Sequence, residues 1–475
     1  MTVRTNGADG SARISFAKNT IVKEVTVCDM NNLGCGVAKC GGKTVFVRGG
    51  VTDDVCDIKI IKDTADYAVA AVDRMISASP RRIDPVCPVY KRCGGCVYRQ
   101  ISYDYELSLK RSAVERAFRR EGLSPTIKDI MSGRESGYRN KVQYPVAYDR
   151  TIGYFAQRTH EVVPVEHCLL QNPAFDCVIG VIKEFLDKYG ICGYDETSGR
   201  GTVRHICLRS GESGISVCLV INDDSLPHAE NLVKMLSVKC PGVVSLSVSV
   251  NKMNTNVIFG ERTFTIYGKP YITDRLCSLE FEISPASFYQ VNRDMAERLY
   301  EKAAEYAELS DGMTLVDLFC GVGTIGLSMI KDKPRCRLVG VEIIPEAVAN
   351  AERNAAANGI ENASFVCGDA NSAEVGSADV IVIDPPRKGC SPGLIDTIAS
   401  GDCKRVVYIS CNPSTLARDC GYFEKHGFET VEVTPADLFP RTGHVECVAL
   451  LTKGRTDIGP ESLRDLKVSA EIEIP

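Results

Sequence analysis

Three short segments carry residues that suit nucleophilic catalysis. Cys411 lies in the run Ser-Cys-Asn-Pro (410–413), directly after an apolar stretch at 405–409 that has the pattern of a strand. Open parallel sheets keep their chemistry at the carboxyl ends of their strands, where a thiolate is both reachable and stabilised. Glu446, in the run His-Val-Glu-Cys (444–447), is a candidate for the base that such a nucleophile needs.

Asp384 opens the third segment, Asp-Pro-Pro-Arg (384–387), which follows an apolar stretch at 380–383. Two prolines in succession make a rigid turn, which can hold a flat ring against the backbone. Together the three segments suggest covalent catalysis on a planar heterocycle. Each residue also has a plainer interpretation, since Cys411 can be one more buried thiol and Glu446 a surface carboxylate.

The elements that would position these residues alternate between strand and helix from residue 284 onward. A parallel doubly wound sheet, a Rossmann-like α/β domain, is the fold that this alternation predicts. The strands are expected at 314–319, 337–342, 363–367, 380–383, 405–409 and 446–451.

A glycine-rich turn follows the first of these strands. The run Gly-Val-Gly-Thr-Ile-Gly, from Gly321 through Thr324, opens a helix and fits a nucleotide-binding turn. Glu342 ends the next strand 21 residues after Gly321, where a carboxylate can bind both ribose hydroxyls. NAD and S-adenosylmethionine both fit this pattern. Four features favour S-adenosylmethionine: Asp317 and Phe319 before the glycines, Asp369 after the third strand, and the proline turn at Asp384 after the fourth.

Composition places the chain among ordinary globular proteins. Its 475 residues suit two or three domains, and no stretch reaches the roughly 18 apolar residues that a membrane span needs. Residues 1–18 lack an apolar run, so we expect a loose tail rather than a signal peptide, and a cytoplasmic protein with no membrane partner. The 22 cysteines are then expected to be mostly reduced core thiols.

The charge of the chain is unevenly distributed. The net charge is −5, yet residues 81–141 hold 14 Lys or Arg against 7 Asp or Glu. A basic stretch of this kind suits contact with phosphate groups. For residues 110–120 alone, a solvated helix face is an equally good interpretation.

The chain divides into five parts by pattern. Short strand patterns at 21–27, 36–40, 44–47 and 55–61, separated by glycine pairs, predict a small β-barrel at 19–77. This barrel resembles the TRAM domain of RNA-modifying enzymes. A mixed pattern predicts a central α/β module at 78–283, and the Rossmann-like domain follows at 284–454. Polar tails are expected at 1–18 and 455–475.

Five segments resemble the motifs of the RNA uracil-C5 methyltransferases, which comprise bacterial 23S rRNA enzymes and their tRNA relatives. They lie at 284–292, 317–326, 384–389, 410–419 and 439–446, and the resemblance covers most of 19–453. The resemblance implies a nucleophile at Cys411 and a base at Glu446. It also implies contacts to S-adenosylmethionine from four residues: Gln290, Phe319, Glu342 and Asp384. Gly443 stands where family members commonly carry His.

The family mechanism follows from the chemistry of uracil. The Cys411 thiolate adds to C6, which makes C5 nucleophilic toward the sulfonium methyl group, and Glu446 then removes the C5 proton. The target base must be unstacked, so a loop or single strand of RNA is the expected partner.

Four cysteines form a candidate metal set. Cys87, Cys93 and Cys96 give a C-x5-C-x2-C run, and Cys168 is a candidate fourth ligand. Spacing alone leaves an iron–sulfur cluster and structural zinc both open. Resemblance to the rRNA enzymes, which carry this set, implies a [4Fe-4S] cluster.

These features favour a 23S rRNA enzyme, and a monomer is the default expectation. A tRNA uracil-C5 methyltransferase is the first alternative, which the barrel and the four cysteines disfavour. An iron–sulfur RNA-binding protein without methyl transfer is the second.

Overall fold

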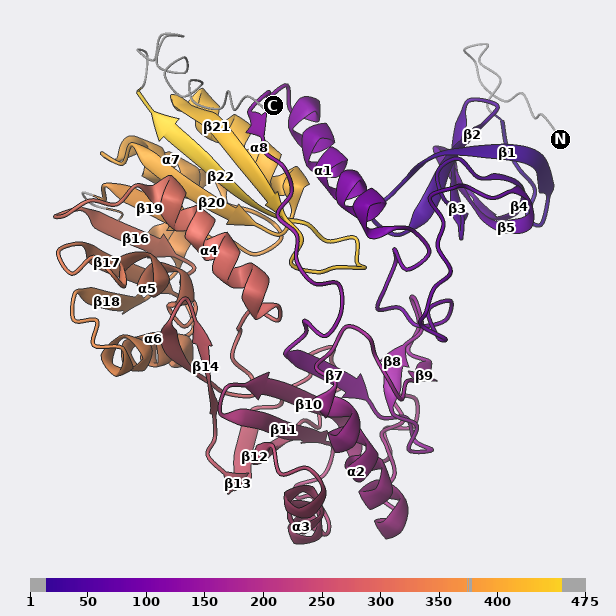
Figure 1. Ribbon diagram of the computed structural model, residues 1–475, viewed down its shortest axis with the longest axis horizontal. Helices are drawn as coiled ribbons and strands as arrows, with labels where there is room; N and C mark the ends of the chain where they lie inside the picture. The colour runs from indigo at the N-terminus through magenta and orange to yellow at the C-terminus, as the bar shows by residue number, and fades with distance from the viewer. Residues whose placement is uncertain (1–13, 374, 376–377, 455–475) are drawn as a thin grey trace, which may run out of the picture.

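The computed structural model describes residues 14–373, 375 and 378–454. Residues 1–13 and 455–475, which include most of the expected tails, lie outside the described residues. Figure 1 shows a small barrel, a large sheet and a smaller central sheet, with helix α1 (Tyr103–Arg120) between the barrel and the large sheet. In the part of the chain that the structure describes, no helix is long and apolar enough to cross a membrane.

The N-terminal unit is a closed barrel of five strands in the order β1-β2-β3-β5-β4. Its inward-facing side chains, such as Val27, Val45 and Ile58, are fully buried, and Phe16 joins them from the segment before β1. The sequence pattern predicts four of the five strands. The fifth, β5, turns Ala68 and Ala70 inward, and alanine carries little strand signal. The strands are β1 (Ile21–Met30), β2 (Cys35–Cys40), β3 (Lys43–Arg48), β4 (Val55–Asp63) and β5 (Tyr67–Ser77).

The central unit is a five-stranded sheet in the order β13-β12-β11-β10-β7, with α2 and α3 packed on it (Figure 1). Helix α2 is amphipathic and buries Phe175, Ile182 and Phe185 against the sheet. A separate hairpin of β8 and β9 flanks β7. The elements are β7 (Lys141–Pro145), β8 (Gly153–Phe155), β9 (Val162–Pro164), α2 (Ala174–Tyr189), β10 (Val203–Gly211), β11 (Gly214–Ile221), α3 (Ala229–Lys239), β12 (Val243–Val250) and β13 (Arg262–Gly268).

The large sheet has eight strands in the order β18-β17-β16-β19-β20-β22-β21-β6. The five strands from β18 to β20 are parallel, which confirms the predicted Rossmann-like fold, and their bounds lie within a residue of the predicted ones. The strands are β16 (Thr314–Leu318), β17 (Arg337–Glu342), β18 (Ala363–Cys367), β19 (Val380–Ile383), β20 (Arg405–Ser410), β21 (Phe428–Ala436), β22 (Glu446–Lys453) and β6 (Thr126–Ile127).

The far end of this sheet departs from the predicted parallel order. Strand β22 runs antiparallel to both β20 and β21, and the sequence pattern does not predict β21. Because β22 is antiparallel, its first residues lie beside the last residues of β20, with Cys447 opposite Ser410. The start of β22 and the end of β20 therefore share one edge of the sheet.

Helix α1 and strand β6 pack with the large sheet rather than with the central one, although both fall within the expected central region. Strand β6 pairs with β21, and α1 packs on α8 (Pro413–Lys425). The reason is the apolar face of α1, where Val114 and Phe118 are buried in the same cluster as Phe423.

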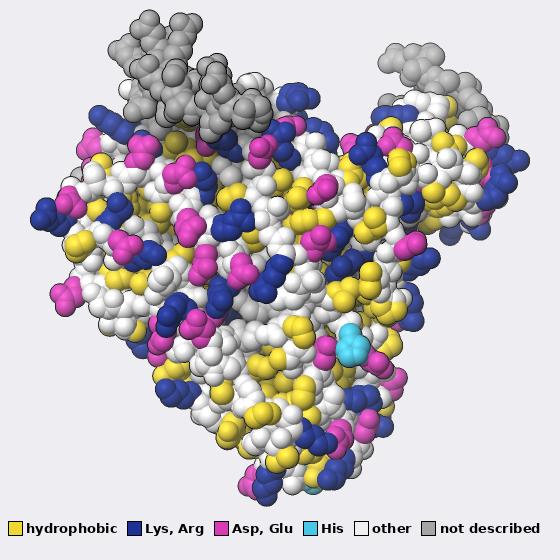
Figure 2. All heavy atoms as spheres, in the orientation of Figure 1, with side chains coloured by type: hydrophobic (Ala, Val, Ile, Leu, Met, Phe, Trp, Pro, Cys, Tyr) yellow, Lys and Arg dark blue, Asp and Glu magenta, His cyan; other side chains and the backbone are white. Residues whose placement is uncertain are grey.

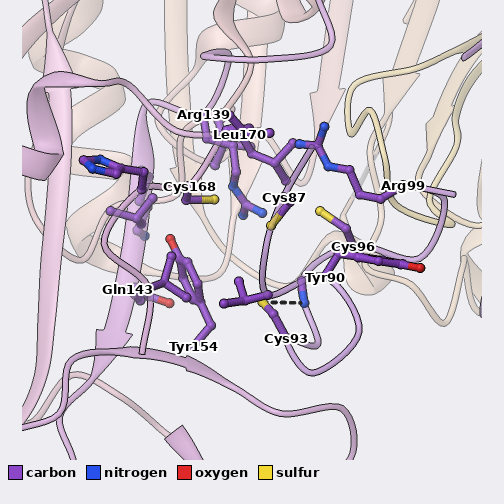
Figure 3. Close-up of a pocket in the computed structure, with 18 residues that line it drawn as sticks. Cys87, Tyr90, Cys93, Cys96, Arg99, Arg139, Gln143, Tyr154, Cys168 and Leu170 are labelled. Atoms are coloured by element: carbon purple, nitrogen blue, oxygen red, sulfur yellow. Dashed lines mark hydrogen bonds between the residues drawn. The ribbon is translucent and has the colours of Figure 1, made fainter. Parts of the chain in front are cut away.

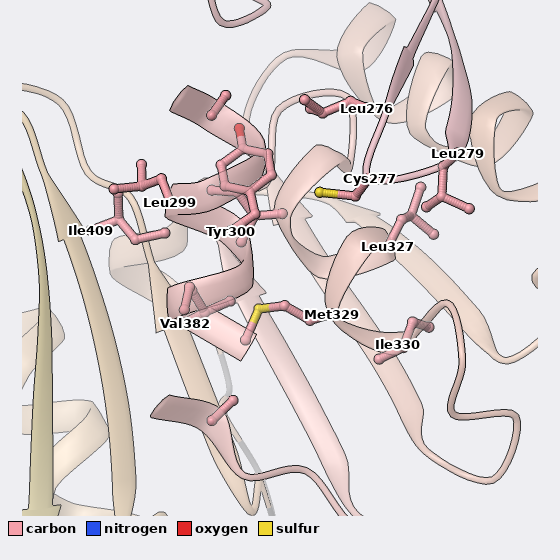
Figure 4. Packing of buried hydrophobic residues seen from close by; sticks show 14 of the residues in the cluster. Leu276, Cys277, Leu279, Leu299, Tyr300, Leu327, Met329, Ile330, Val382 and Ile409 are labelled. Atoms are coloured by element: carbon pink, nitrogen blue, oxygen red, sulfur yellow. The ribbon is translucent and has the colours of Figure 1, made fainter. Parts of the chain in front are cut away.

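The two faces of the large sheet are covered by different helices. On one face, Leu299 and Tyr300 of α4 and Leu327 of α5 pack on the strands and on the hairpin β14–β15 (Figure 4). On the other face, α1, α7 and α8 form a second core. The remaining elements are β14 (Ile272–Leu276), β15 (Leu279–Ile283), α4 (Arg293–Ala307), α5 (Thr324–Ile330), α6 (Pro345–Ala357), the short 3-10 helix η1 (Ala370–Ser372) and α7 (Pro392–Ser400).

Candidate active site

The register of the large sheet brings the predicted site residues to a single edge. Leu318 pairs with Val341 and with Ile383, and Ile383 pairs with Tyr408, so the parallel strands end together. The antiparallel β22 begins where β20 ends. The residues at or just beyond this edge are Phe319, Glu342, Asp384, Cys411 and Glu446.

The glycine turn between β16 and α5 is closed by two carboxylates. The N–H of Gly321 donates to Oε2 of Glu342 at 3.1 Å, and the N–H of Gly326 donates to Oδ2 of Asp317 at 2.8 Å. A Cβ atom at Gly326 would lie 2.8 Å from that same oxygen, so only glycine fits there. Phe319 has a φ of 65°, a left-handed conformation that non-glycine residues hold mainly at functional sites.

Asp317 precedes the glycine turn and is one of the residues that favour S-adenosylmethionine, although the sequence assigns it no specific contact. Its Oδ1 atom is buried and has no hydrogen-bond partner. Burial, followed by the nearby Asp384 and Glu342 carboxylates, raises the pKa of Asp317 to about 8. Its position near the carboxyl end of strand β16, just before the glycine turn, is the signal that points to it. Three carboxyl groups thus converge beside the glycine turn, a suitable environment for a cation.

Gln290 and Thr324 meet at the hydroxyl group of Tyr300. The Thr324 Oγ1 atom lies 3.3 Å from that hydroxyl, and the Gln290 side chain also interacts with it. Asp369 lies apart from this group. Its exposed carboxylate accepts from the N–H of Asn371 at 3.0 Å, and this contact lowers the pKa of Asp369.

Cys411 and Glu446 interact electrostatically at the edge of the sheet. Cys411 is half-buried immediately before α8, whereas Glu446 is only 6% exposed. Burial raises the pKa of Glu446 to about 8, with a further contribution from Asp384. The pKa of the Cys411 thiol is raised as well, first by burial and then by Glu446. The thiol and the carboxyl group are therefore held close together in a poorly solvated place.

Arg387 is a second residue that the sequence analysis does not assign, although it ends the Asp-Pro-Pro-Arg run. Its guanidinium group lowers the pKa of both Cys411 and Glu446, which favours their ionised forms. Its Nη2 atom lies 3.4 Å from the His444 ring, and its carbonyl accepts from Nδ2 of Asn412 at 3.1 Å. Arg387 thus connects the proline turn to the segment that carries Cys411.

The thiol of Cys411 opens onto a cavity of about 370 Å³. One wall comes from the segments around Cys411 and the start of β22, including His444 and Arg387. A second wall is the barrel turn at Asn31 and Asn32, and a third is the C-terminal half of α1. The cavity therefore lies where the barrel, α1 and the large sheet meet.

A buried ion network holds the loop 437–445, which leads into Glu446. Nζ of Lys110 on α1 donates to Oε1 of Glu106 and to Oδ1 of Asp437, both at 2.7 Å. All three charged groups are at most 2% exposed. The network therefore ties the loop to α1.

Arg441 is the second anchor of this loop. Its N–H donates to Oε1 of Glu106 at 2.7 Å, and its guanidinium group donates to the carbonyl of Ile101 at 2.9 Å. Its carbonyl accepts from the N–H of Val97 at 2.9 Å. Because Val97 follows Cys96, this bond joins the cysteine-rich segment to the loop before Glu446.

Gly443 is the point where the loop contacts the barrel. A Cβ atom at Gly443 would lie 1.7 Å from the backbone oxygen of Asn32. We expect Gly443→Ala to push the barrel turn away from the Cys411 cavity and to lower the free energy of unfolding by about 1–3 kcal/mol. Thermal melting would measure this, with Gly180→Ala on α2 as the control, since a Cβ there meets nothing within 4 Å. Equal behaviour of the two variants would contradict the prediction.

The four predicted metal-ligating cysteines line one cavity of about 330 Å³. In Figure 3 the thiol groups of Cys87, Cys96 and Cys168 point into the same space, and Cys93 lies below them. Burial raises the pKa of Cys96 to about 11, with contributions from Cys168 and Cys93. Among the described residues, however, no three His, Cys, Asp or Glu side chains are arranged to hold a single metal ion.

Two arginines give this cavity a positive character. Arg99 and Arg139 both line it, and each has a buried Nε atom without a hydrogen-bond partner. Burial raises the pKa of both Cys96 and Cys168, and Arg99 and Arg139 respectively oppose that rise. Two arginines with unpaired Nε atoms beside four thiols fit an anionic occupant that is larger than one ion.

The fold and the site together define a nucleotide-binding methyltransferase-type domain. A methyltransferase domain family matches residues 309–422, which span the glycine turn and Cys411. An uncharacterized RNA methyltransferase of Halalkalibacterium halodurans is 40% identical over 448 residues, 91% of this chain and 97% of that protein. One of Clostridium acetobutylicum is 39% identical over 446 residues, 90% of this chain and 96% of that protein. The chain belongs to this family of RNA methyltransferases, and it is an enzyme of that class.

A solved structure extends the similarity beyond the methyltransferase domain. The Pyrococcus abyssi tRNA (uracil-54, C5)-methyltransferase, in complex with S-adenosyl-L-homocysteine, superimposes with a TM-score of 0.74 and 26% sequence identity. The similarity covers 90% of this chain and 100% of that chain. The arrangement of the three units is therefore shared with that enzyme.

Proposed function

We propose that this enzyme transfers the methyl group of S-adenosylmethionine to C5 of a uridine in RNA, through a covalent bond between Cys411 and C6 of uracil. The observation that carries the proposal is the convergence of Cys411, Glu446 and Asp384 at one edge of the sheet, beside the glycine turn. The likeness to a tRNA uracil-C5 methyltransferase supports it.

The methyl donor is proposed to bind at the glycine turn. Glu342, which already accepts from Gly321, is suited to the ribose hydroxyls, and Gln290, Phe319, Thr324 and Asp384 are proposed to surround the rest of the donor. S-adenosylmethionine is a sulfonium cation, which supplies an electrophilic methyl group. The convergent carboxyl groups of Asp317, Glu342 and Asp384 are suited to that positive charge.

Asp369 is the proposed donor contact with the least structural support. It follows β18, where such domains place an acid near adenine, yet its carboxylate is exposed and occupied by the Asn371 N–H. We propose that it contacts the adenine end of the donor, which lies furthest from Cys411.

The proposed reaction uses Cys411 and Glu446 in turn. The Cys411 thiolate forms a bond to C6, and the electrons of the C5=C6 bond then take the methyl group, which leaves S-adenosylhomocysteine. Glu446 removes the proton from C5, and the bond from sulfur to C6 breaks as the double bond returns. Arg387 stabilises the thiolate, since its guanidinium group lowers the pKa of Cys411.

This mechanism predicts a pH dependence of the rate. Both groups must be deprotonated, and burial raises the pKa of Glu446 to about 8 and that of Cys411 above its ordinary value. We expect kcat/KM to rise from roughly pH 7 to pH 9, with apparent pKa values that belong to the interacting pair. A pH–rate profile of methyl transfer measures this, and a profile that is flat over that range would contradict it.

The same shift predicts an effect on stability. The folded protein binds the Glu446 proton more tightly than the unfolded chain, so stability is lost as pH rises from the ordinary pKa of 4.5 through about 8. Glu446→Gln should therefore melt a few degrees higher than the wild type at roughly pH 9, and at the same temperature near pH 4. Asp384, whose pKa burial raises to about 7, is present in both proteins and therefore does not account for the difference between them. A variant that is less stable at both pH values would contradict the burial of an uncharged carboxyl group.

The proposed substrate is a uridine in an unstacked segment of 23S rRNA. The set of four cysteines, which resembles that of the rRNA enzymes and lines one cavity, supports this choice. A tRNA is the second candidate, because the similar solved structure is a tRNA enzyme and its similarity extends over 90% of this chain. The presence of the barrel therefore does not distinguish an rRNA substrate from a tRNA substrate.

Labelled methyl transfer to rRNA fragments and to tRNA, followed by nucleoside analysis, tests the proposed function. The expected product is 5-methyluridine in the rRNA fragment. Methyl transfer to tRNA alone would show that tRNA, and not 23S rRNA, is the substrate. A methylated product other than 5-methyluridine would contradict the proposed reaction.

We further propose that Cys87, Cys93, Cys96 and Cys168 hold a [4Fe-4S] cluster, with zinc as the alternative. The shared cavity and the unpaired Nε atoms of Arg99 and Arg139 support an anionic cluster. Such a cluster would fix the segment around Cys96, which Val97 joins to the loop before Glu446. Protein purified without air should be brown and contain iron and sulfide. Colourless protein that contains zinc would contradict the cluster.

A further inference from the structure

The C-terminal half of α1 presents a regular stripe to the Cys411 cavity. Ala113, Arg116, Ala117 and Arg120 all line that cavity. Their spacing of three and four residues places them on one face of the helix. Arg119, although exposed, does not line the cavity, because it lies on another face.

The charge of the cavity lining is entirely positive. Arg116, Arg120 and Arg387 line it, and none of the described residues in the lining carries a carboxylate. The surface elsewhere is mixed, and Figure 2 shows Lys and Arg interspersed with Asp and Glu over the visible face. The cavity is therefore a local site for anions on a protein whose net charge is −5.

The geometry of the stripe suits a chain of phosphate groups. Four residues along a helix rise about 6 Å, so the two arginine side chains can contact different phosphates of one strand. The small side chains of Ala113 and Ala117 leave room between them. Asn31 and Asn32, on the opposite wall, offer neutral polar groups.

We propose that Arg116 and Arg120 bind the phosphodiester backbone of the substrate RNA on the two sides of the nucleotide that enters the Cys411 cavity. This inference rests on the proposed function, since it takes that nucleotide to be the target uridine. The two arginines hold the strand while the base turns inward, and they contact no base edge. The contact is therefore independent of sequence, as phosphate contacts are.

Asp29 limits this contact. Its carboxylate lies 3.6 Å from the Arg116 guanidinium group, and both side chains are more than 40% exposed. The pair competes with a phosphate for Arg116. Asp29→Asn removes the competing charge and keeps an oxygen that can accept from the N–H of Met30, as the carboxylate now does at 2.8 Å.

Binding of a short single-stranded RNA with one uridine, measured over a range of salt concentrations, tests the inference. The log–log slope of affinity against salt should decrease by about 0.7 for Arg116→Ala and again for Arg120→Ala. Arg119→Ala, which removes the same charge from the same helical turn, should leave the slope unchanged. Asp29→Asn should bind the RNA more tightly than the wild type.

The outcomes separate this inference from the proposed function. If Arg119→Ala lowers the slope as much as Arg116→Ala, the charge acts diffusely and the inference is wrong. If Asp29→Asn does not tighten RNA binding, the proposed contact between Arg116 and a phosphate is wrong. If the wild type makes no 5-methyluridine while the slopes behave as expected, the proposed function fails and the phosphate site stands.

Discussion

Cys411→Ala is expected to lower the rate of methyl transfer by about 10⁴-fold or more, because loss of a covalent nucleophile removes the step on which the others depend. The side chain is half-buried and lies next to Glu446 and Arg387. Binding of S-adenosylmethionine should be unchanged, since the glycine turn is formed by β16, β17 and α5. Single-turnover methyl transfer and calorimetric binding of the donor measure the two quantities.

The matched control is Cys367→Ala, which removes an exposed thiol at the end of β18. Its rate should stay within a factor of about two of the wild type, since surface changes of this kind have small effects. A Cys411→Ala enzyme with near-normal turnover would show that methyl transfer does not need the thiol.

Lys110→Met is expected to be the most destabilising change outside the catalytic residues. It leaves the buried Asp437 carboxylate without its cation and leaves Glu106 with only the Arg441 guanidinium group, 3.5 Å away, and removing one partner of a buried ion pair costs about 3–5 kcal/mol. Because Asp437 belongs to the loop that leads into Glu446, the rate should fall as well. Denaturant unfolding and methyl-transfer rates, taken well below the melting temperature, measure both effects.

Lys183→Met on α2 is the control for this change. Lys183 also pairs with a carboxylate one turn away, Asp187 at 2.7 Å, but both side chains are more than 40% exposed, so the loss should be below about 1 kcal/mol. Adding Asp437→Asn to Lys110→Met should restore part of the stability, because one unpaired charge is removed. A Lys110→Met protein as stable as the control would mean that the network contributes little.

The part of the fold that the sequence predicts is the part with regular periodicity. The strands that carry Asp317, Glu342 and Asp384 are apolar runs bounded by turns, so they can be identified one at a time. Strand β21 and the reversed direction of β22 cannot, because direction depends on which strand lies beside β20. The position of α1 on the large sheet is also tertiary, since it depends on Val114 and Phe118 packing with Phe423 of α8, about 300 residues further along the chain.

The candidate site, like the fold, is predicted from the sequence only in part. Cys411 and the glycine turn follow predicted strands, and the sequence places both at the correct edge of the sheet. Glu446 reaches that edge only through the antiparallel β22, so spacing could not pair it with Cys411. Arg116 and Lys110 belong to one basic stretch, yet one lines the cavity and the other is buried in an ion network. Charge counts along the chain do not distinguish such roles.

The most direct test of the account is the covalent adduct between Cys411 and uracil. Glu446→Gln keeps the thiol but removes the base, so the enzyme should form the bond to C6, transfer the methyl group and then stall. Mass spectrometry of that variant, incubated with S-adenosylmethionine and substrate RNA, should find a methylated nucleotide attached to the peptide that contains Cys411. The adduct should be absent when Cys411→Ala is added. An equally abundant adduct in the double variant, or attachment at another residue, would contradict the account.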